Sequence, residues 1–331
     1  MFRLDNDMTP IGANKTDARP AQTMTIAIVG DVHGQWGRRD TQALEALGVD
    51  LALFVGDFGN EAVPIVQQIA AVAVPKAVIL GNHDAWYTAS KNKRKKCPYD
   101  PTKEDRLQRQ LDVLGDCHVG FSKLEIPRHN ATVIGTRPYS WGGSKWRHSQ
   151  FYRDRCQVTS FAQSTAKICK SIDMANHRTL IFLGHNGPTG LGDQVHSICG
   201  RDWKRSGGDY GDVDFADAIA HARSTNHQVP LAVFGHMHHE LKHDKTRLRD
   251  RVVVDDQGTV YVNGANVPRV LETDSGWQCS FTLVTLAEGK VQTVRLIWVD
   301  AAAALLSGEF LYSQDRKTQH IPRRVDEFGL A

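Results

Sequence analysis

The sequence predicts an α/β fold with a mostly parallel inner sheet. In the first quarter of the chain, short β-branched runs alternate with amphipathic helical segments, and each run ends at a glycine. Further apolar runs in the C-terminal half are joined by short turns, a pattern typical of antiparallel pairs that predicts a second sheet. Ligand sites of α/β sheets lie beyond the carboxyl ends of the strands, so we expect the functional residues there.

The first half of the chain contains the strand-loop-helix units. We expect strands at 25–29, 51–55 and 77–80, and helices at 40–47, 61–72 and 103–114. Residues 119–135 predict a hairpin. The charged insertion 91–106 holds five basic residues within 91–96. It is interpreted either as solvated surface or as a collar that attracts phosphate-bearing substrates.

The second half continues with helices at 157–176 and 213–223 and strands at 180–183 and 231–234. A glycine-rich segment, 187–212, is expected to form a loop beside the site. Paired strands are predicted within 251–265 and 280–298. We expect a disordered tail at 1–24, one domain over 25–300 and a C-terminal extension at 301–331.

The composition is that of a globular protein, with 41% apolar and 23% charged residues. The 40 basic residues are nearly balanced by 37 acidic ones, so nucleic acid is a disfavoured partner. The six cysteines form no C-x-x-C pair and no long apolar segment is present, which favours a cytoplasmic protein with reduced thiols and no membrane partner. The plastid stroma is the alternative for a plant source. The oligomeric state is not indicated.

Five predicted strands end in glycine followed by Asp, Asn or His, in the segments GDVH, GDFGN, GNHD, GHNGP and GHMH. If the strands are neighbours, one sheet edge gathers seven side chains: Asp31, His33, Asp57, Asn82, His185, His236 and His238. Carboxylates, an amide and imidazoles suit divalent cations, and seven ligands exceed one tetrahedral ion. Two metals bridged by a carboxylate are therefore favoured, although each residue alone has a structural explanation as a helix cap or turn residue.

This ordered series, from Asp31 to His238, resembles the signature of the calcineurin-like metallophosphoesterase superfamily. The resemblance implies a four-layer α/β/β/α sandwich of two mixed sheets flanked by helices. It also implies a first metal held by Asp31, His33 and His238, a second held by Asn82, His185 and His236, and Asp57 as the bridge. By the same resemblance, His83 contacts the phosphate and protonates the leaving oxygen after attack by a metal-bridging hydroxide, with Asp84 as its orienting partner.

The resemblance implies a phosphoesterase that hydrolyses mono- or diesters of a small phosphorylated substrate, such as a nucleotide. Two divalent ions are expected; manganese is favoured, and iron, zinc, cobalt or magnesium also fit the ligands. The segment GDFGNE lacks the Val-Asp-Arg-Gly run of phosphoprotein phosphatases, which disfavours that activity. Several loops, including GTRPYSWGG and YVNGANVPR, look similar to an uncharacterised metallophosphoesterase family of cyanobacteria and plant plastids.

Two alternatives to this function are a nuclease of the same superfamily and a catalytically silent scaffold protein. A scaffold is expected to have lost a ligand or the proton donor, and here His83 and all seven candidate ligands are present. Arg137, in GTRPYSWGG, is a further candidate for binding an anionic substrate, and packing against the neighbouring loop is its alternative role.

Overall fold

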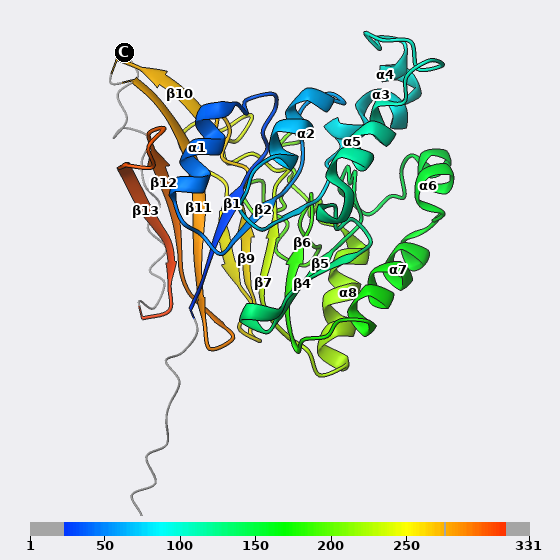
Figure 1. Ribbon diagram of the computed structural model, residues 1–331. Helices are drawn as coiled ribbons and strands as arrows, with labels where there is room; N and C mark the ends of the chain where they lie inside the picture. Colours follow the sequence, from blue (N-terminus) through cyan, green and yellow to red (C-terminus); the bar gives the residue numbers. More distant parts are fainter. Residues whose placement is uncertain (1–22, 275, 316–331) are drawn as a thin grey trace, which may run out of the picture.

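A computed structural model describes residues 23–274 and 276–315, so the predicted tail lies outside the described residues except for its last two positions. Two mixed sheets form the centre of the molecule (Figure 1). The first sheet runs in the order β13 (Leu305–Ser313), β12 (Lys290–Val299), β11 (Gly276–Ala287), β1 (Met24–Val29), β2 (Leu51–Phe54) and β3 (Lys76–Val78), with β10 (Val270–Thr273) paired to β11. The second runs in the order β4 (Lys123–Ile126), β5 (Ala131–Gly135), β6 (Thr179–Leu183), β7 (Gln228–Phe234), β9 (Val260–Asn263) and β8 (Val252–Val254).

Helices cover the outer faces of the two sheets (Figure 1). On the first sheet lie α1 (Arg38–Ala46), α2 (Val63–Ala70) and α5 (Arg106–Leu114). On the second sheet lie α7 (Phe161–Asp173) and α8 (Val213–Ser224). The shorter helical elements are η1 (His83–Ala85), α3 (Trp86–Ala89), α4 (Lys91–Arg94), η2 (Gly115–Cys117), η3 (Pro127–His129) and α6 (Ser149–Cys156).

Alternation of side chains along the strands produces three apolar cores. In β1, Ile26 and Ile28 point into the core between the sheets, whereas Ala27 and Val29 point to the helices on the first sheet. In β6, Phe182 packs under the helices of the second sheet, while its neighbours face the other sheet. Three cores separate four layers, which confirms the predicted α/β/β/α sandwich.

The strands that carry the five motifs are divided between the two sheets. β1, β2 and β3 are parallel neighbours in the first sheet, and β6 and β7 are parallel neighbours in the second. Their carboxyl ends meet where the sheets approach closely, because Gly30 after β1 lies against Gly264 after β9. A Cβ atom on Gly30 would lie 1.9 Å from the Gly264 carbonyl oxygen. The site is thus built across both sheets rather than along one edge.

Two features of the chain differ from the sequence prediction. The helix expected over 157–176 is α7, which begins only at Phe161, because Gln157 adopts a left-handed conformation with φ of 58° and ends a separate, preceding helix, α6, that the sequence did not predict. Ser160 then caps α7 by accepting a hydrogen bond from the Gln163 amide. The hairpin of β11 and β12 is confirmed, but it joins the first sheet through β1 rather than the second.

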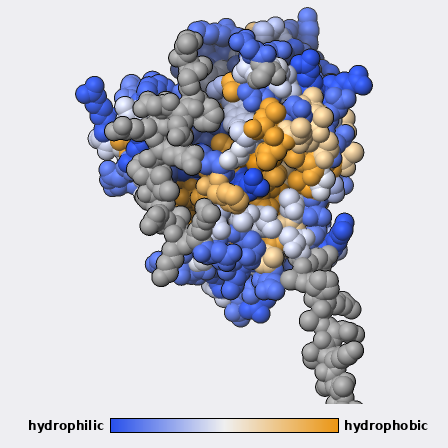
Figure 2. Space-filling model, turned by 90° about the vertical axis from the view of Figure 1, so that its left-hand side faces the viewer, coloured by the Kyte–Doolittle hydropathy of each residue, from blue (hydrophilic) through white to orange (hydrophobic). Residues whose placement is uncertain are grey.

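The first sheet continues beyond residue 300, where the expected domain boundary lies. β13 pairs along most of β12 and forms the outer edge of the sheet. It exposes Leu305, Leu306 and Phe310 to more than half of their full accessibility. Figure 2 looks at the side of the molecule where β13 lies and shows a hydrophobic area there. Across residues 23–274 and 276–315, no helix is both long and apolar enough to cross a membrane.

The contact at Gly30 generates a stability prediction. Gly30→Ala places a methyl group onto the Gly264 carbonyl, so we expect a loss of about 1–3 kcal/mol or more in the free energy of unfolding, measured by urea denaturation. Gly37→Ala is the control, since its Cβ meets nothing closer than 3.9 Å. Equal stability of the two variants would contradict the close approach of the sheets.

Candidate metal centre

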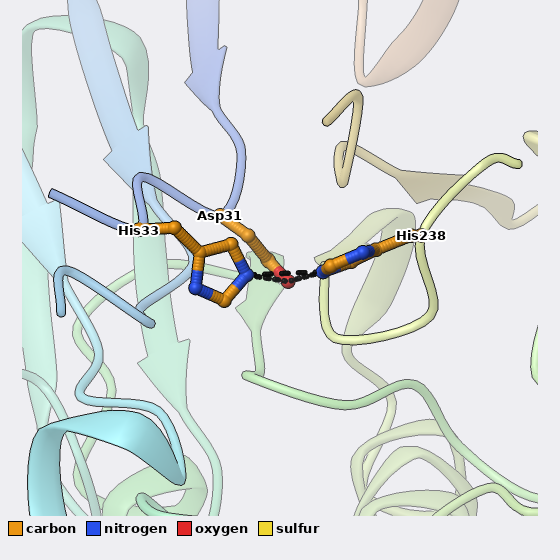
Figure 3. A group of neighbouring side chains, drawn as sticks. All are labelled: Asp31, His33 and His238. Carbon is orange, nitrogen blue, oxygen red and sulfur yellow. Dashed lines mark hydrogen bonds and ion pairs between the residues drawn. The ribbon is translucent and has the colours of Figure 1, made fainter. Parts of the chain in front are cut away.

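One group of candidate ligands joins the ends of β1 and β7, and so the two sheets. The atoms His33 Nε2 and His238 Nε2 lie 3.0 Å apart. Asp31 Oδ2 lies 3.4 Å from His238 Nε2 and 3.9 Å from His33 Nε2. Figure 3 shows the carboxylate lying between the two imidazole rings. Three ligand atoms from two loops thus point to one small volume.

A second group lies beside the first and is formed by Asp57, His185 and His236. Asp57 Oδ1 is 3.3 Å from His185 Nε2, and the rings of His185 and His236 lie 5.0 Å apart. Asn82 joins this group because its Oδ1 is 2.9 Å from His185 Nε2. All seven candidate ligands are therefore brought together, and Asp57 also lies in a third group, with His33 and His83, that connects the two.

The hydrogen bonds of His185 test whether these residues fit a cation. Its Nδ1 lies 2.7 Å from the Val55 carbonyl oxygen, so Nδ1 carries the proton and donates it there. In the neutral ring, Nε2 then has only a lone pair, and it faces the oxygens of Asn82 and Asp57. Three acceptors that converge in a buried place require positive charge among them, which fits a divalent cation.

The electrostatics of the two buried carboxylates lead to the same conclusion. Burial and the negative charge of Asp31 raise the pKa of Asp57 well above its ordinary value. Burial also acts to raise the pKa of Asp31, but the hydrogen bond and charge of His238 outweigh it and hold that pKa below its ordinary value. The two buried carboxylates therefore repel each other, and cations between them would remove the penalty.

Three of the candidate ligands have a backbone conformation that residues other than glycine seldom adopt. The φ angles of His33, Asp57 and His236 are 46°, 54° and 68°. This left-handed region is uncommon for residues other than glycine and is enriched at functional sites. The turns are held by neighbouring contacts, including the bond from the His33 amide to the Asp57 carbonyl. The loops therefore adopt an unfavourable backbone conformation that directs these side chains inward.

Comparison with known proteins assigns the fold and the centre to a family. The family described as "Calcineurin-like phosphoesterase" matches residues 24–240, about two thirds of the chain. The chain belongs to the calcineurin-like phosphoesterase family. It is therefore a hydrolase that acts on phosphoric esters, with candidate ligands for a dimetal centre. A comparison with curated proteins finds no match.

Solved structures with a similar chain trace include TT1561 of Thermus thermophilus, which is 11% identical with a TM-score of 0.45, covering 88% of this chain and 100% of that one. A dimetal phosphatase from Danio rerio is 12% identical with a TM-score of 0.44, covering 88% and 99% of the two chains. The NAD nucleotidase of Haemophilus influenzae is 10% identical with a TM-score of 0.43, covering 85% and 56%.

Asp84 does not orient His83 as the sequence analysis expected. Its buried carboxylate accepts hydrogen bonds from the backbone amides of Asp57, Phe58 and Gly81, at 2.7 to 2.9 Å. These amides belong to the turns after β2 and β3. Asp84 therefore fixes the backbone that carries two candidate ligands, and the side chain that holds the His83 ring is a different one.

The side chain that holds the His83 ring is that of Asn60, whose Oδ1 lies 2.6 Å from His83 Nδ1. The His83 ring is also held by Trp86, which stacks on it at a centroid distance of 4.2 Å. Sequence reasoning missed both residues. Asn60 stands within the quoted segment GDFGN, three positions after Asp57, so its place in a ligand-bearing turn was the available signal.

Arg137 has the packing role that the sequence left open. Its side chain is buried and forms ion pairs with Asp212 at 2.9 Å and Asp214 at 2.7 Å. It also lies against the ring of Trp146. A guanidinium engaged in this way is not free for a substrate anion, so packing, and not anion binding, is the role that fits. The same loop contributes Trp141 to the surroundings of His83, because Trp141 stacks on Trp86.

The shared position of Asp57 generates a prediction for metal binding. We expect Mn²⁺, added at about one hundred times its Kd, to stabilise the wild type by about 2.7 kcal/mol, seen as a higher Tm by calorimetry. Asp57→Asn should lose at least half of this gain. Without metal, it should be no less stable than the wild type, because it removes a buried charge.

Asp217→Asn, at an exposed position of α8, is the matched control and should keep the full gain. A metal-induced shift of equal size in Asp57→Asn would contradict a role for Asp57 as a ligand.

Proposed function

We propose that this phosphoesterase hydrolyses mono- or diesters of a small phosphorylated molecule with the help of two divalent cations, manganese being favoured. The observation that carries the proposal is the place of Asp57, which approaches His33 on one side and His185 on the other. The first cation would be held by Asp31, His33 and His238, and the second by the group around His185. When bound, such cations supply a nucleophilic water at neutral pH and offset charge on the phosphoryl oxygens.

His83 is the proposed proton donor to the leaving oxygen. Its ring lies 5.0 Å from that of His33, at the edge of the candidate centre, and it is partly accessible. Burial and the neighbouring His33 lower the pKa of His83 to about 4. The negative charge of a bound phosphate acts in the opposite direction and favours the protonated ring. Proton donation would thus be coupled to substrate binding.

Asn60 and Trp86 are the proposed positioning residues for this step. The Asn60 oxygen accepts the Nδ1 proton of His83, which leaves the other ring nitrogen to face the substrate. The stacked indole of Trp86 restricts rotation of the ring. The second stack, of Trp141 on Trp86, supports the whole arrangement from the loop after β5.

Hydrolysis of p-nitrophenyl phosphate and of its bis ester tests the function. We expect a rate that requires added Mn²⁺, and the ester that reacts separates a monoesterase from a diesterase. His83→Ala should lower kcat by about 10²–10⁴-fold for an alkyl phosphate, whose leaving oxygen needs a proton, and by less for the p-nitrophenyl esters. Activity without any divalent metal, or undiminished in both His83→Ala and Asp57→Asn, would overturn the proposal.

The role of Asn60 is tested by comparing leaving groups. Asn60→Ala should lower kcat by about tenfold for an alkyl phosphate, whose leaving oxygen needs a proton, and much less for the p-nitrophenyl ester. Asn60→Asp, which keeps the acceptor, should recover most of the rate. If both esters lose activity equally, Asn60 has only a structural role.

A further inference from the structure

A pocket of about 420 Å³ opens directly beside two of the candidate metal ligands, His236 and His238. Its other walls come from the segments 202–203 and 240–249 and from Val267. The volume lies within the range of pockets that hold small organic ligands. A phosphoryl group at the candidate metal centre would therefore have space for an attached group on this side.

The pocket presents an aromatic surface. Trp203 lines it and remains 39% exposed, which is high for so large an apolar side chain. The ring is held in place by Tyr210, which meets it edge to face at 4.6 Å. Tyr210 is itself fixed, because its carbonyl accepts hydrogen bonds from Gly143 and from the Asn186 side chain. An ordered indole in a pocket wall is suited to stacking on a planar ring.

The pocket also carries positive charge. Two of its cations are paired with lining carboxylates, Arg249 with Asp202 at 3.3 Å and Lys245 with Glu240 at 3.2 Å. The guanidinium of Arg249 is further engaged by backbone carbonyls, which makes it part of the wall. Among the described residues, the Lys242 ammonium has no ion pair, so it is available to an anionic ligand.

We propose that this pocket binds the nucleoside end of a nucleotide substrate that carries more than one phosphate. The base would stack on Trp203, and a phosphate other than the reacting one would pair with Lys242. A planar ring and a second anion, connected to a phosphoryl group, match the three features that the pocket and the neighbouring centre offer. The inference rests on the proposed function in that the reacting phosphate lies at the candidate metal centre. For a nucleoside diphosphate, it extends that function from esters to a phosphoanhydride: water adds to the terminal phosphorus, the bond from that phosphorus to the bridging oxygen breaks, and the nucleoside monophosphate leaves.

Binding is tested on the full-length protein, as purified, by calorimetric titration with α,β-methylene-ADP, which resists hydrolysis at the bridged position. We expect this analogue to bind at least tenfold more tightly than adenosine or methylenediphosphonate alone. Trp203→Leu and Lys242→Gln should each weaken its binding at least fivefold. The matched controls, Trp277→Leu and Lys290→Gln on the first sheet, should retain wild-type affinity.

Kinetics give a second readout through phosphate release from ADP and from glycerol 2-phosphate. In the Trp203 and Lys242 variants, the ratio of kcat/KM for ADP to that for glycerol 2-phosphate should fall about tenfold, mainly through KM for ADP. Affinity within twofold of wild type in both variants, or equal loss in the controls, would overturn the pocket assignment. Tight binding of the analogue without hydrolysis of any ester would support the pocket and contradict the proposed function.

Discussion

The structure of the site depends on one electrostatic constraint: carboxylate, amide and imidazole lone pairs converge around Asp31, Asp57 and His185, which are buried. His185 illustrates it, since its proton is committed to the Val55 carbonyl and its free nitrogen faces only oxygens. Such an arrangement is costly unless positive charge lies between the groups. The left-handed turns at His33, Asp57 and His236 and the raised pKa of Asp57 occur at the same site. They are the features expected of a chain shaped to hold cations.

The sandwich supplies this convergence because each sheet contributes only part of the ligand set. Asp31 and His33 follow β1, while His238 follows β7 in the other sheet. The apolar core between the sheets holds their spacing, and the contact of Gly30 with Gly264 brings the two sets of strand ends within reach of one another. The geometry of the candidate centre is therefore a consequence of sheet packing. No single loop could create it.

Local pattern was sufficient to predict the strands that carry the five motifs and the convergence of the seven candidate side chains, because β-branched runs that end in glycine and a polar residue are informative within a few positions. It could not predict how the strands divide between two sheets, nor that β11 would pair with β1, since pairing depends on partners far apart in sequence. The role of Arg137 stayed open between anion binding and packing for the same reason: its carboxylate partners lie 75 and 77 positions away. The roles of Asp84 and Asn60 depend on a turn geometry that residue spacing does not determine.

The carboxylate of Asp84 has a consequence for how the centre moves. The carboxylate accepts hydrogen bonds from three backbone amides in the turns after β2 and β3, and so joins these turns into one mechanical unit. Local opening of either turn would break bonds that belong to the other, so the amides of Asp57, Phe58 and Gly81 share one opening event rather than three independent ones. Asp57 and Asn82 are thus carried together, and neither can move away from the candidate centre without the other.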